Sequence, residues 1–434
     1  MKVLLVSNLV LDRTSNMGKT FLSYFDAFSP DEIAQFFIYS EVPTDDGTCR
    51  RYYRFTDRDA VRSIFCRKTQ GTIFGSDDID RTRTDPRVDT GIQTKIYRAG
   101  SKKTPFIHMM RNFVWKMSRW KSEKLLDWIR DFGPDAVFFA SGDSLFMYNI
   151  AREISETFHI PLIISAVDDF YVYNRHQGQM FGTSYFKTFM KTVRKTMDAA
   201  SCVLPICDSM GEQYQKMFGI PCYTLHTPVE RKKVALRPDA SQISYIGNVD
   251  FGRYLQLVDI GRSLREQNGN GLPDMLDVYS QERNPAFLEL LTEENGIRFH
   301  GAISAEEVVQ TMEKSLAVVH TESFDPKTRE IVRYSVSTKI AESLMYGPCL
   351  LAYGPEGIES IDYLRRNDAA FVITDKKDLP AGLRSVCANA AERERILKNA
   401  RLLAETNHDI KRTGRQVRDW IGQCIEDAKK ADNR

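Results

Sequence analysis

Residues 334–355, YSVSTKIAESLMYGPCLLAYGP, constrain the fold of this chain most, because a helix and a buried strand follow each other there directly. The helix is expected over 340–346 and stops at Gly347-Pro348. The apolar run Cys349–Tyr353 is typical of a buried parallel strand, and it ends in Gly354-Pro355. The segment therefore predicts one loop, helix, strand and turn unit of an α/β sheet.

The start of this helix carries the groups that an anion site needs. Ser335, Ser337 and Thr338 have hydroxyls that cap helices, and the backbone N–H groups that follow them can meet a phosphate. Lys339 adds a full positive charge, and Glu342, about one turn further on, can accept from both hydroxyls of a ribose. The pattern favours a bound nucleotide. The simpler alternative is an ordinary strand and helix unit with a capped helix.

Short apolar runs alternate with longer amphipathic stretches along the chain, which is typical of parallel sheets covered by helices. In the first half, strands are expected at 2–8, 34–39, 136–140, 161–167, 202–206 and 222–226, with the first of them central in its sheet. In the second half they are expected at 243–247, 275–279, 297–300, 316–320, 349–353 and 370–373. Helix-rich stretches cover 106–131 and 182–198, whereas 50–98 is polar and gives no clear pattern.

This spacing predicts an α/β protein of two Rossmann-like, doubly wound domains. A length of 434 residues, 42% hydrophobic and 27% charged, suits two such domains. Their boundary is expected in the charged, proline-containing linker 230–240, so that one domain covers 1–235 and the other 241–410. An amphipathic helix is expected at about 411–430.

Composition argues against several classes of protein. A net charge of +2 makes a nucleic-acid partner improbable. The apolar part of MKVLLVSNLV is too short for a signal peptide, and no stretch approaches the roughly 18 apolar residues of a membrane span, so a cytoplasmic protein is expected. The eight cysteines lack CxxC spacing and the seven histidines form no HxH or HExxH, so neither a disulfide framework nor a metal site is expected.

The strand expected at 243–247 ends in the loop GNVDFGRY, residues 247–254. Gly247 lets the backbone approach a ligand closely, and Arg253 can hold a diphosphate with its bidentate guanidinium. The alternative is a surface arginine on a turn.

These segments resemble the nucleotide-sugar site of the retaining, family 4-like glycosyltransferases of the GT-B fold, whose bacterial members build surface polysaccharides. In that family a helix glutamate binds the donor ribose, and Glu342 occupies its position. Many members have a second glutamate eight residues earlier, where this chain has Tyr334. We take Glu322, in the segment HTESFD with His320, as the group that holds the sugar hydroxyls instead. The likeness covers nearly the whole chain and implies two domains facing across a cleft, with the terminal helix crossing back onto the first.

The resemblance also implies which cations face the donor. Many members have Gly-Arg at the turn and a lysine six residues after the glycine; here Asn248 replaces the arginine, and Arg253 fits the lysine. Lys339 then supplies the missing charge. Arg253 and Lys339 would stabilise the departing diphosphate while Ser337 and Thr338 cap it.

In the first domain, residues 15–20, SNMGKT, end like a Walker motif but lack its first glycine, because that position is Arg13. The resemblance instead places Gly18 and Lys19 in a glycine loop over 9–20, near the donor phosphate and the acceptor, before a helix from about residue 21. The strand at 161–167 delivers Asp168 at its carboxyl end, where a carboxylate can orient or deprotonate an acceptor hydroxyl. Asp168-Asp169 fits the N-cap of the next helix equally well.

The stretch 101–124 has Phe106, Met110, Phe113 and Met117 at helical spacing among lysines and arginines. Two interpretations stay open. Such a helix can lie on an anionic membrane surface, or its apolar stripe can pack on a sheet with the cations in solvent. The resemblance favours the membrane, because many of these enzymes extend a glycan carried on a polyprenyl diphosphate lipid.

The sequence therefore predicts a glycosyltransferase that moves a sugar from a nucleoside-diphosphate sugar to a saccharide or lipid-linked acceptor, without a metal. Retention of the anomeric configuration follows from the likeness alone. Two alternatives stay open: a nucleotide-sugar epimerase of the same fold, and a non-catalytic subunit that keeps the fold for binding. The membrane interpretation of 101–124 would place the protein at the inner face of the membrane.

Overall fold

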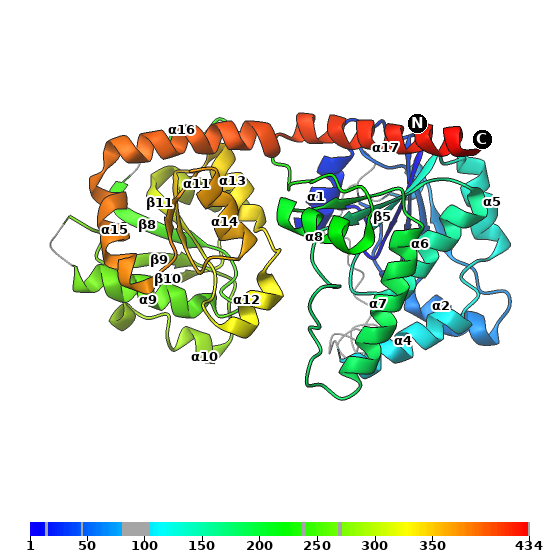
Figure 1. The fold of residues 1–434 in the computed structure, drawn as a ribbon, viewed down its shortest axis with the longest axis horizontal. Coiled ribbons are helices and arrows are strands. Elements are labelled where there is room, and N and C mark those ends of the chain that lie inside the picture. Colours follow the sequence, from blue (N-terminus) through cyan, green and yellow to red (C-terminus); the bar gives the residue numbers. More distant parts are fainter. Residues whose placement is uncertain (14–15, 45–46, 80–103, 237–238, 268–270, 433–434) are drawn as a thin grey trace. The chain divides into compact units, whose positions relative to one another are not determined.

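The computed structural model describes residues 1–13, 16–44, 47–79, 104–236, 239–267 and 271–432. The chain folds into two compact units (Figure 1). The first unit comprises Met1–His226 together with Ile410–Arg434, and the second comprises Thr227–Asp409. The break after His226 lies a few residues before the linker expected at 230–240, and the C-terminal helix belongs to the first unit.

In its described residues, the first unit has a seven-stranded sheet in the order β4-β3-β2-β1-β5-β6-β7. The strands are β1 (Val3–Ser7), β2 (Ile33–Phe37), β3 (Arg51–Arg54), β4 (Thr72–Phe74), β5 (Ala136–Ala140), β6 (Leu162–Ala166) and β7 (Cys202–Pro205). β3 and β4 pair antiparallel, and the other neighbours pair in parallel. Counted in chain order, the parallel strands follow the 3-2-1-4-5-6 order of a Rossmann sheet, with β1 central as expected.

Helices cover this sheet, and the last of them returns from the C-terminus (Figure 1). They are α1 (Asn16–Tyr24), α2 (Asp57–Phe65), the short η1 (Ser76–Asp78), α4 (Pro105–Met117), α5 (Glu123–Phe132), α6 (Leu145–Phe158), α7 (Gly182–Asp198), α8 (Asp208–Phe218) and α17 (Ile410–Asp432). α17 buries Val417 and Ile421 in the core of the first unit. Arg418 on α17 donates to both oxygens of Glu32, at 2.8 and 2.9 Å, and this pairing lowers the pKa of Glu32 to about 2.

Across its described residues, the second unit has a six-stranded parallel sheet in the order β10-β9-β8-β11-β12-β13. The strands are β8 (Asp239–Ile246), β9 (Leu276–Tyr279), β10 (Ile297–Gly301), β11 (Ser315–Thr321), β12 (Cys349–Tyr353) and β13 (Phe371–Ile373). The helices are α9 (Arg253–Glu266), α10 (Pro285–Leu288), η2 (Glu293–Asn295), α11 (Ala305–Lys314), α12 (Pro326–Val332), α13 (Thr338–Tyr346), α14 (Glu359–Arg366), η3 (Lys376–Asp378), α15 (Leu379–Ala388) and α16 (Ala390–Asn407). This sheet repeats the 3-2-1-4-5-6 order, so the expected doubly wound α/β class is confirmed for both sheets.

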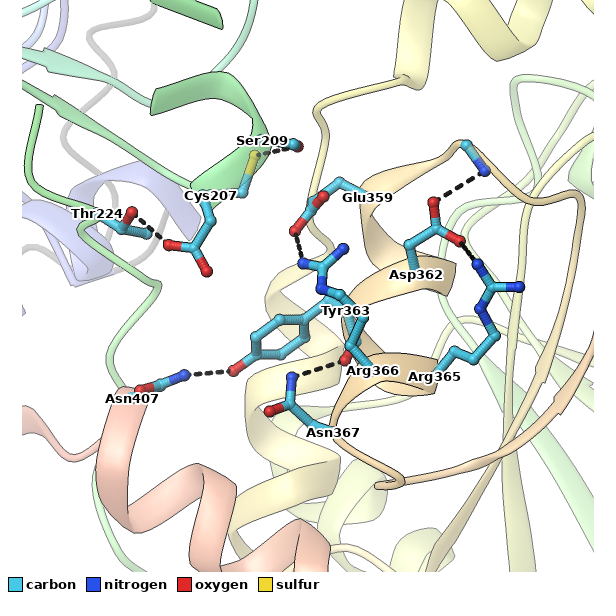
Figure 2. Close-up of polar contacts among 12 residues, drawn as sticks. Cys207, Ser209, Thr224, Glu359, Asp362, Tyr363, Arg365, Arg366, Asn367 and Asn407 are labelled. Atoms are coloured by element: carbon cyan, nitrogen blue, oxygen red, sulfur yellow. Dashed lines mark hydrogen bonds and ion pairs between the residues drawn. The ribbon is translucent and has the colours of Figure 1, made fainter. Parts of the chain in front are cut away.

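A buried polar network ties the first residues of the second unit to its last. His408 accepts from or donates to the hydroxyl of Tyr363 through Nε2 at 3.0 Å, and its Nδ1 lies 2.7 Å from the carbonyl oxygen of Thr227. Asn407 donates to the same tyrosine hydroxyl at 3.1 Å, as Figure 2 shows. The backbone N–H of Val229 donates to the carbonyl of His408. The segment that enters the second unit is therefore fixed to the segment that leaves it.

The structure corrects three expectations about local structure. Residues 222–226 do not form a strand: only Cys222 makes an isolated bridge, to Val203. The polar part of 50–98 contains β3 and β4 within its described residues, and the helix-rich stretch 106–131 is two helices, α4 and α5. α1 begins at Asn16, so the loop expected over 9–20 is shorter than predicted.

No helix among the described residues is both long enough and apolar enough to cross a membrane.

Candidate active site

The predicted donor residues gather at one edge of the second sheet. β8 and β11 are neighbours in the middle of that sheet, and the strand order reverses direction between them. Ligands of doubly wound sheets bind outside the carboxyl ends of the strands at this switch point. Gly247 directly follows β8, and Glu322 directly follows β11. The predicted residues of these two loops therefore lie where the topology favours a ligand.

The loop after β8 is tightly constrained. The hydroxyl of Tyr245 donates to the carbonyl of Asn248, and the Asn248 side chain accepts from the backbone N–H of Asp250 at 2.8 Å. Phe251 and Gly252 both adopt left-handed backbone, with φ of 57° and 75°. A Cβ at Gly252 would lie 2.7 Å from Oγ of Ser323 in the neighbouring loop. The loop thus passes against the residue that follows Glu322, and glycine permits both the turn and the approach.

Arg253, the first residue of α9, points its guanidinium at Glu322. Nε donates to Oε2 at 3.1 Å and Nη2 donates to Oε1 at 2.8 Å, which is a bidentate pair. The Glu322 side chain is 1% exposed and that of Arg253 is 17% exposed. Burial opposes the charge of Arg253, but Glu322 outweighs it, so the pKa of Arg253 is raised. Burial raises the pKa of Glu322, against the pull of Arg253. Because the guanidinium stays cationic, we treat the pair as ionised at neutral pH.

His320 lies beneath this pair at the end of β11. Its Nε2 shares a hydrogen bond of 2.9 Å with the hydroxyl of Ser360 and lies 3.6 Å from Oε1 of Glu322. The side chain is buried, and burial together with the nearby Arg253 lowers the pKa of His320 to about 3. His320 is therefore a neutral support of the Arg253–Glu322 pair at physiological pH.

This shift predicts acid sensitivity of the second unit. In the unfolded chain the imidazole of His320 binds a proton below about pH 6.5, whereas in the folded state its lowered pKa opposes protonation. Stability is therefore fully present above that pH and falls as the pH drops towards 3, by up to about 1.4 kcal/mol per pH unit. We expect urea denaturation at pH 6.5, 5.5 and 4.5 to give falling free energies of unfolding, and His320→Gln to give a lower but flatter series. His159→Asn, at an exposed histidine, should leave the slope unchanged. A slope as steep in His320→Gln as in the parent would refute the assignment.

The helix α13 carries the other predicted donor residues at its N-terminus. Ser337 is the N-cap, and its hydroxyl accepts from the backbone N–H of Lys339 at 3.3 Å. Thr338 is the first helical residue. Nζ of Lys339 pairs with Oε2 of Glu342 at 2.7 Å, and the two side chains are 36% and 29% exposed. α13 leads directly into β12 and runs back against it, so its N-terminus lies at the same edge of the sheet as Glu322.

The two ion pairs at this edge differ in strength. A partly exposed pair such as Lys339–Glu342 contributes about 0–1 kcal/mol and can exchange with solvent or a ligand. Breaking a buried pair such as Arg253–Glu322 by removing one partner costs about 3–5 kcal/mol. Arg253 is therefore a fixed cation, whereas Lys339 and Glu342 can each turn to another partner.

Known proteins match both the second unit and the whole fold. Residues 273–419 match the model of a family described as glycosyl transferase-like. The structure of HepE of Anabaena in complex with UDP is 10% identical, with a TM-score of 0.60 over 98% of this chain and 100% of that chain. Sucrose-phosphate synthase of Thermosynechococcus elongatus is 12% identical, with a TM-score of 0.60 over 98% and 100%. WaaG, described as a glycosyltransferase involved in lipopolysaccharide biosynthesis, is 14% identical, with a TM-score of 0.54 over 96% and 99%. No curated protein sequence matches the chain.

The chain has the GT-B fold, and its residues 273–419 match the glycosyl transferase-like family. The family match covers α13 and the loop after β11, and the structural matches cover both units. The resemblance read from residues 243–254 and 317–355 is thereby confirmed at the level of the fold, and the family match includes 317–355. The roles of individual residues stay predictions.

In the first unit, two of the predicted site residues, Gly18 and Lys19, do not lie in the expected loop. Gly18 and Lys19 belong to the first turn of α1, not to a glycine loop. A Cβ at Gly18 would lie 2.4 Å from the carbonyl oxygen of Asp12, so glycine there permits close packing of α1 on the chain after β1. Lys19 is exposed.

Asp168 and Asp169, which follow β6, make different contacts. Asp168 accepts from Nη2 of Arg175 at 2.9 Å and is partly exposed. Asp169 is buried and accepts from the backbone N–H groups of Tyr171 and Val172, at 3.1 and 3.0 Å, and from the hydroxyl of Tyr214. Asp169 therefore fixes the turn, which leaves Asp168 as the carboxylate that can face an acceptor.

Sequence reasoning did not single out three residues that lie beside the predicted site residues: Gly252, Ser323 and Ser360. The second glycine of GNVDFGRY was a usable signal for Gly252. Ser323 and Ser360 become visible only through contacts with Gly252 and His320. Within the described ranges no group of three or more His, Cys, Asp or Glu side chains is arranged to hold a metal ion.

Proposed function

We propose that this chain is a glycosyltransferase that transfers a sugar from a uridine-diphosphate sugar to a saccharide or lipid-linked acceptor, with retention of configuration. The observation that carries the proposal is the buried Arg253–Glu322 pair at the switch point of the second sheet. A fixed cation at that place suits a diphosphate leaving group. Uridine is chosen because solved structures of the same fold hold UDP or UDP-glucose, as HepE does.

The donor would be held by groups from both loops and from α13. Gly247 lets the backbone approach the donor, and Arg253 donates its remaining N–H groups to the diphosphate. Lys339 leaves Glu342 and adds the second positive charge, at little cost because that pair is exposed. Glu342, once released, accepts from the ribose hydroxyls. The two charges that develop on the leaving diphosphate are then met by two cations.

For Glu322 we propose a different role from the one first expected. Both of its oxygens are engaged by Arg253, so it acts as a positioning residue that orients the guanidinium. The sugar hydroxyls expected to contact Glu322 would then be met by other groups. Ser337 and Thr338, at the start of α13, are the candidates for capping the diphosphate.

The acceptor is assigned to the first unit, in which Asp168 would orient or deprotonate the attacking hydroxyl. Gly18 and Lys19, in α1 beside the carboxyl end of β1, would line the same edge of that sheet. In this proposal the domain 1–235 binds the acceptor and the domain 241–410 binds the donor. We also propose that the product belongs to a surface polysaccharide or a related glycan and that the enzyme works at the inner face of the membrane.

A thermal-shift panel tests the donor. We expect UDP to raise the melting temperature, and GDP, ADP and CMP to raise it less, in buffer with EDTA. A ligand at 100 times its Kd stabilises by about 2.7 kcal/mol, which is readily measured. UDP-glucose and other UDP sugars then identify the sugar. If GDP or ADP stabilises the protein more than UDP does, the choice of uridine is wrong. If no nucleotide stabilises the protein, the proposed donor site is wrong.

A further inference from the structure

The helix α4 presents its apolar stripe to solvent. The large apolar side chains of this helix that are exposed are Phe106, Met109, Met110, Phe113 and Met117. Their spacing of three or four residues places them on one helical face. Phe113, in the middle of the stripe, is 60% exposed. The prediction that this stripe packs on a sheet is therefore wrong, and the stripe needs another explanation.

The orientation of α4 is fixed by its opposite face. Trp115 is buried, stacks on Phe146 with ring centroids 4.3 Å apart, and donates from Nε1 to Asp57 at 2.6 Å. Arg111 donates to the same carboxylate at 2.9 Å and to the hydroxyl of Ser144 at 3.1 Å. These contacts hold the helix against α2 and α6. The exposed stripe is thus a stable surface of the first unit rather than a helix turned the wrong way.

The start of α7 extends the exposed apolar area at the N-terminal end of α4. Phe181, at the start of α7, lies with its ring 6.4 Å from that of Phe106, and it is 49% exposed. Met180 beside it is also exposed. At the other end, the backbone N–H of Arg119 donates to the hydroxyl of Ser63 on α2. Phe65, two residues further along α2, is 85% exposed.

The same three elements concentrate positive charge. Residues 57–68, 104–122 and 182–198 hold twelve Lys and Arg against three Asp and Glu, although the whole chain holds 60 against 58. Asp57 is paired with Arg111, and Asp59 is used in the N-terminal cap of α2. The exposed cations of these elements include Lys116 and Arg119, on and just after α4, and Lys187 and Lys191 on α7. An apolar centre surrounded by cations suits a surface that is itself anionic with an apolar interior.

We propose that the face formed by α2, α4 and the start of α7, here called the docking face, binds an anionic lipid bilayer. Phe106, Phe113 and Phe181 enter the boundary between headgroups and acyl chains, while the lysines and arginines meet the phosphates. A second copy of the chain is a poor occupant, because two such faces would bring like charges together. The inference deepens the proposed function and rests on it for its purpose, since a lipid-linked acceptor lies at that surface.

Flotation of the full-length protein with vesicles tests the docking face. We expect binding to vesicles of phosphatidylcholine and phosphatidylglycerol in equal amounts, and little binding to phosphatidylcholine alone. Lys187→Gln with Lys191→Gln should weaken binding roughly 30-fold, because each basic residue near an anionic surface contributes about a fivefold factor. Phe106→Ser with Phe113→Ser should weaken it at least roughly tenfold, since buried Phe side chains are lost from the lipid.

Matched controls lie on α16 of the second unit. Leu402 is 64% exposed and Lys398 is exposed there, so Leu402→Ser with Lys398→Gln repeats the same chemistry away from the docking face. These variants should bind vesicles like the parent, and all variants should keep the parent melting temperature and its shift with UDP. Absence of flotation, equal flotation with neutral vesicles, or equal loss in the controls would each overturn the proposal. So would a concentration-dependent dimer that Phe106→Ser with Phe113→Ser dissolves. Flotation without any shift of the melting temperature by UDP would instead contradict the proposed donor site and would still support the docking face.

Discussion

Replacing Arg253 by alanine is expected to lower kcat/KM for transfer by about 10² to 10³, the loss typical of removing one preorganised charge donor from an active site. The Arg253 side chain is only 17% exposed and its guanidinium is bound at two points by Glu322, so it needs no reorganisation to meet the departing diphosphate. Binding of UDP should weaken as well, because the diphosphate carries its charge before and after transfer. Kinetics with a UDP sugar, together with calorimetric titration of UDP, measures both effects.

Arg253→Ala also leaves Glu322, which is 1% exposed, without its partner. Such a change costs about 3–5 kcal/mol of stability, so a loss of activity alone would not separate catalysis from folding. The double change Arg253→Met with Glu322→Leu removes both buried charges. It should recover most of the stability and still fail to bind UDP tightly or to transfer sugar. Arg262→Ala, at an exposed arginine on the same helix, is the matched control and should behave like the parent. If Arg253→Ala binds UDP as well as the parent does, the site is misplaced.

Glu322→Gln separates the position of Arg253 from its charge. The amide keeps the size of the side chain but provides only one acceptor oxygen, so the bidentate grip on the guanidinium is lost. If Glu322 orients Arg253, this variant loses rate while the charge of Arg253 persists. A direct contact between Glu322 and the donor sugar, as first expected, would instead alter the choice among UDP sugars.

The strands of both sheets were predictable because most of them are short, fully buried apolar runs. β5 and β12 begin and end at the predicted residues, and both are buried along their whole length. β4 was missed because it is a three-residue edge strand with exposed residues, which leaves no apolar pattern to read. Residues 222–226 have the composition of a strand and lie along β7, where the backbone N–H groups of Tyr223 and Leu225 donate to Val203 and Pro205, but only Cys222 forms a bridge, so they are not a named strand. Burial on both faces gives the central strands continuous apolar runs, whereas β3 and β4, at the end of the first sheet, have polar or exposed residues and give no such run.

The site was only partly readable, for a related reason. Gly247, Arg253, Lys339 and Glu342 could be predicted from the sequence because they lie in loops or near helix starts around predicted strands. No contact between them had to be known. The partner of Arg253 lies 69 residues away in sequence, and no local pattern discloses that pairing. The pairing of Lys339 with Glu342 is an i,i+3 contact on one helix and follows from helical spacing. Sequence thus located the candidate groups, whereas tertiary structure decided which of them is fixed and which can move.

Glu342→Gln is expected to weaken binding of UDP roughly 10- to 150-fold, the effect of losing a hydrogen bond to a charged group worth about 1.5–3 kcal/mol. The carboxylate can accept from both ribose hydroxyls, whereas the amide accepts through one oxygen only. Stability should change little, because the ion pair with Lys339 is exposed and contributes about 0–1 kcal/mol. Titration of UDP, of 2′-deoxy-UDP and of inorganic diphosphate measures where the loss arises.

The three ligands distinguish a ribose contact from a general effect of charge. The parent should prefer UDP to 2′-deoxy-UDP, and Glu342→Gln should abolish that preference while binding inorganic diphosphate as the parent does. Lys339→Gln breaks the same ion pair but keeps the carboxylate, so it should weaken all three ligands and retain the preference for ribose. Glu330→Gln, at an exposed glutamate on α12, is the matched control and should leave every affinity unchanged. A preference for UDP that survives in Glu342→Gln would mean that another residue reads the ribose, and that the helix glutamate serves only to hold Lys339 in place before the donor arrives.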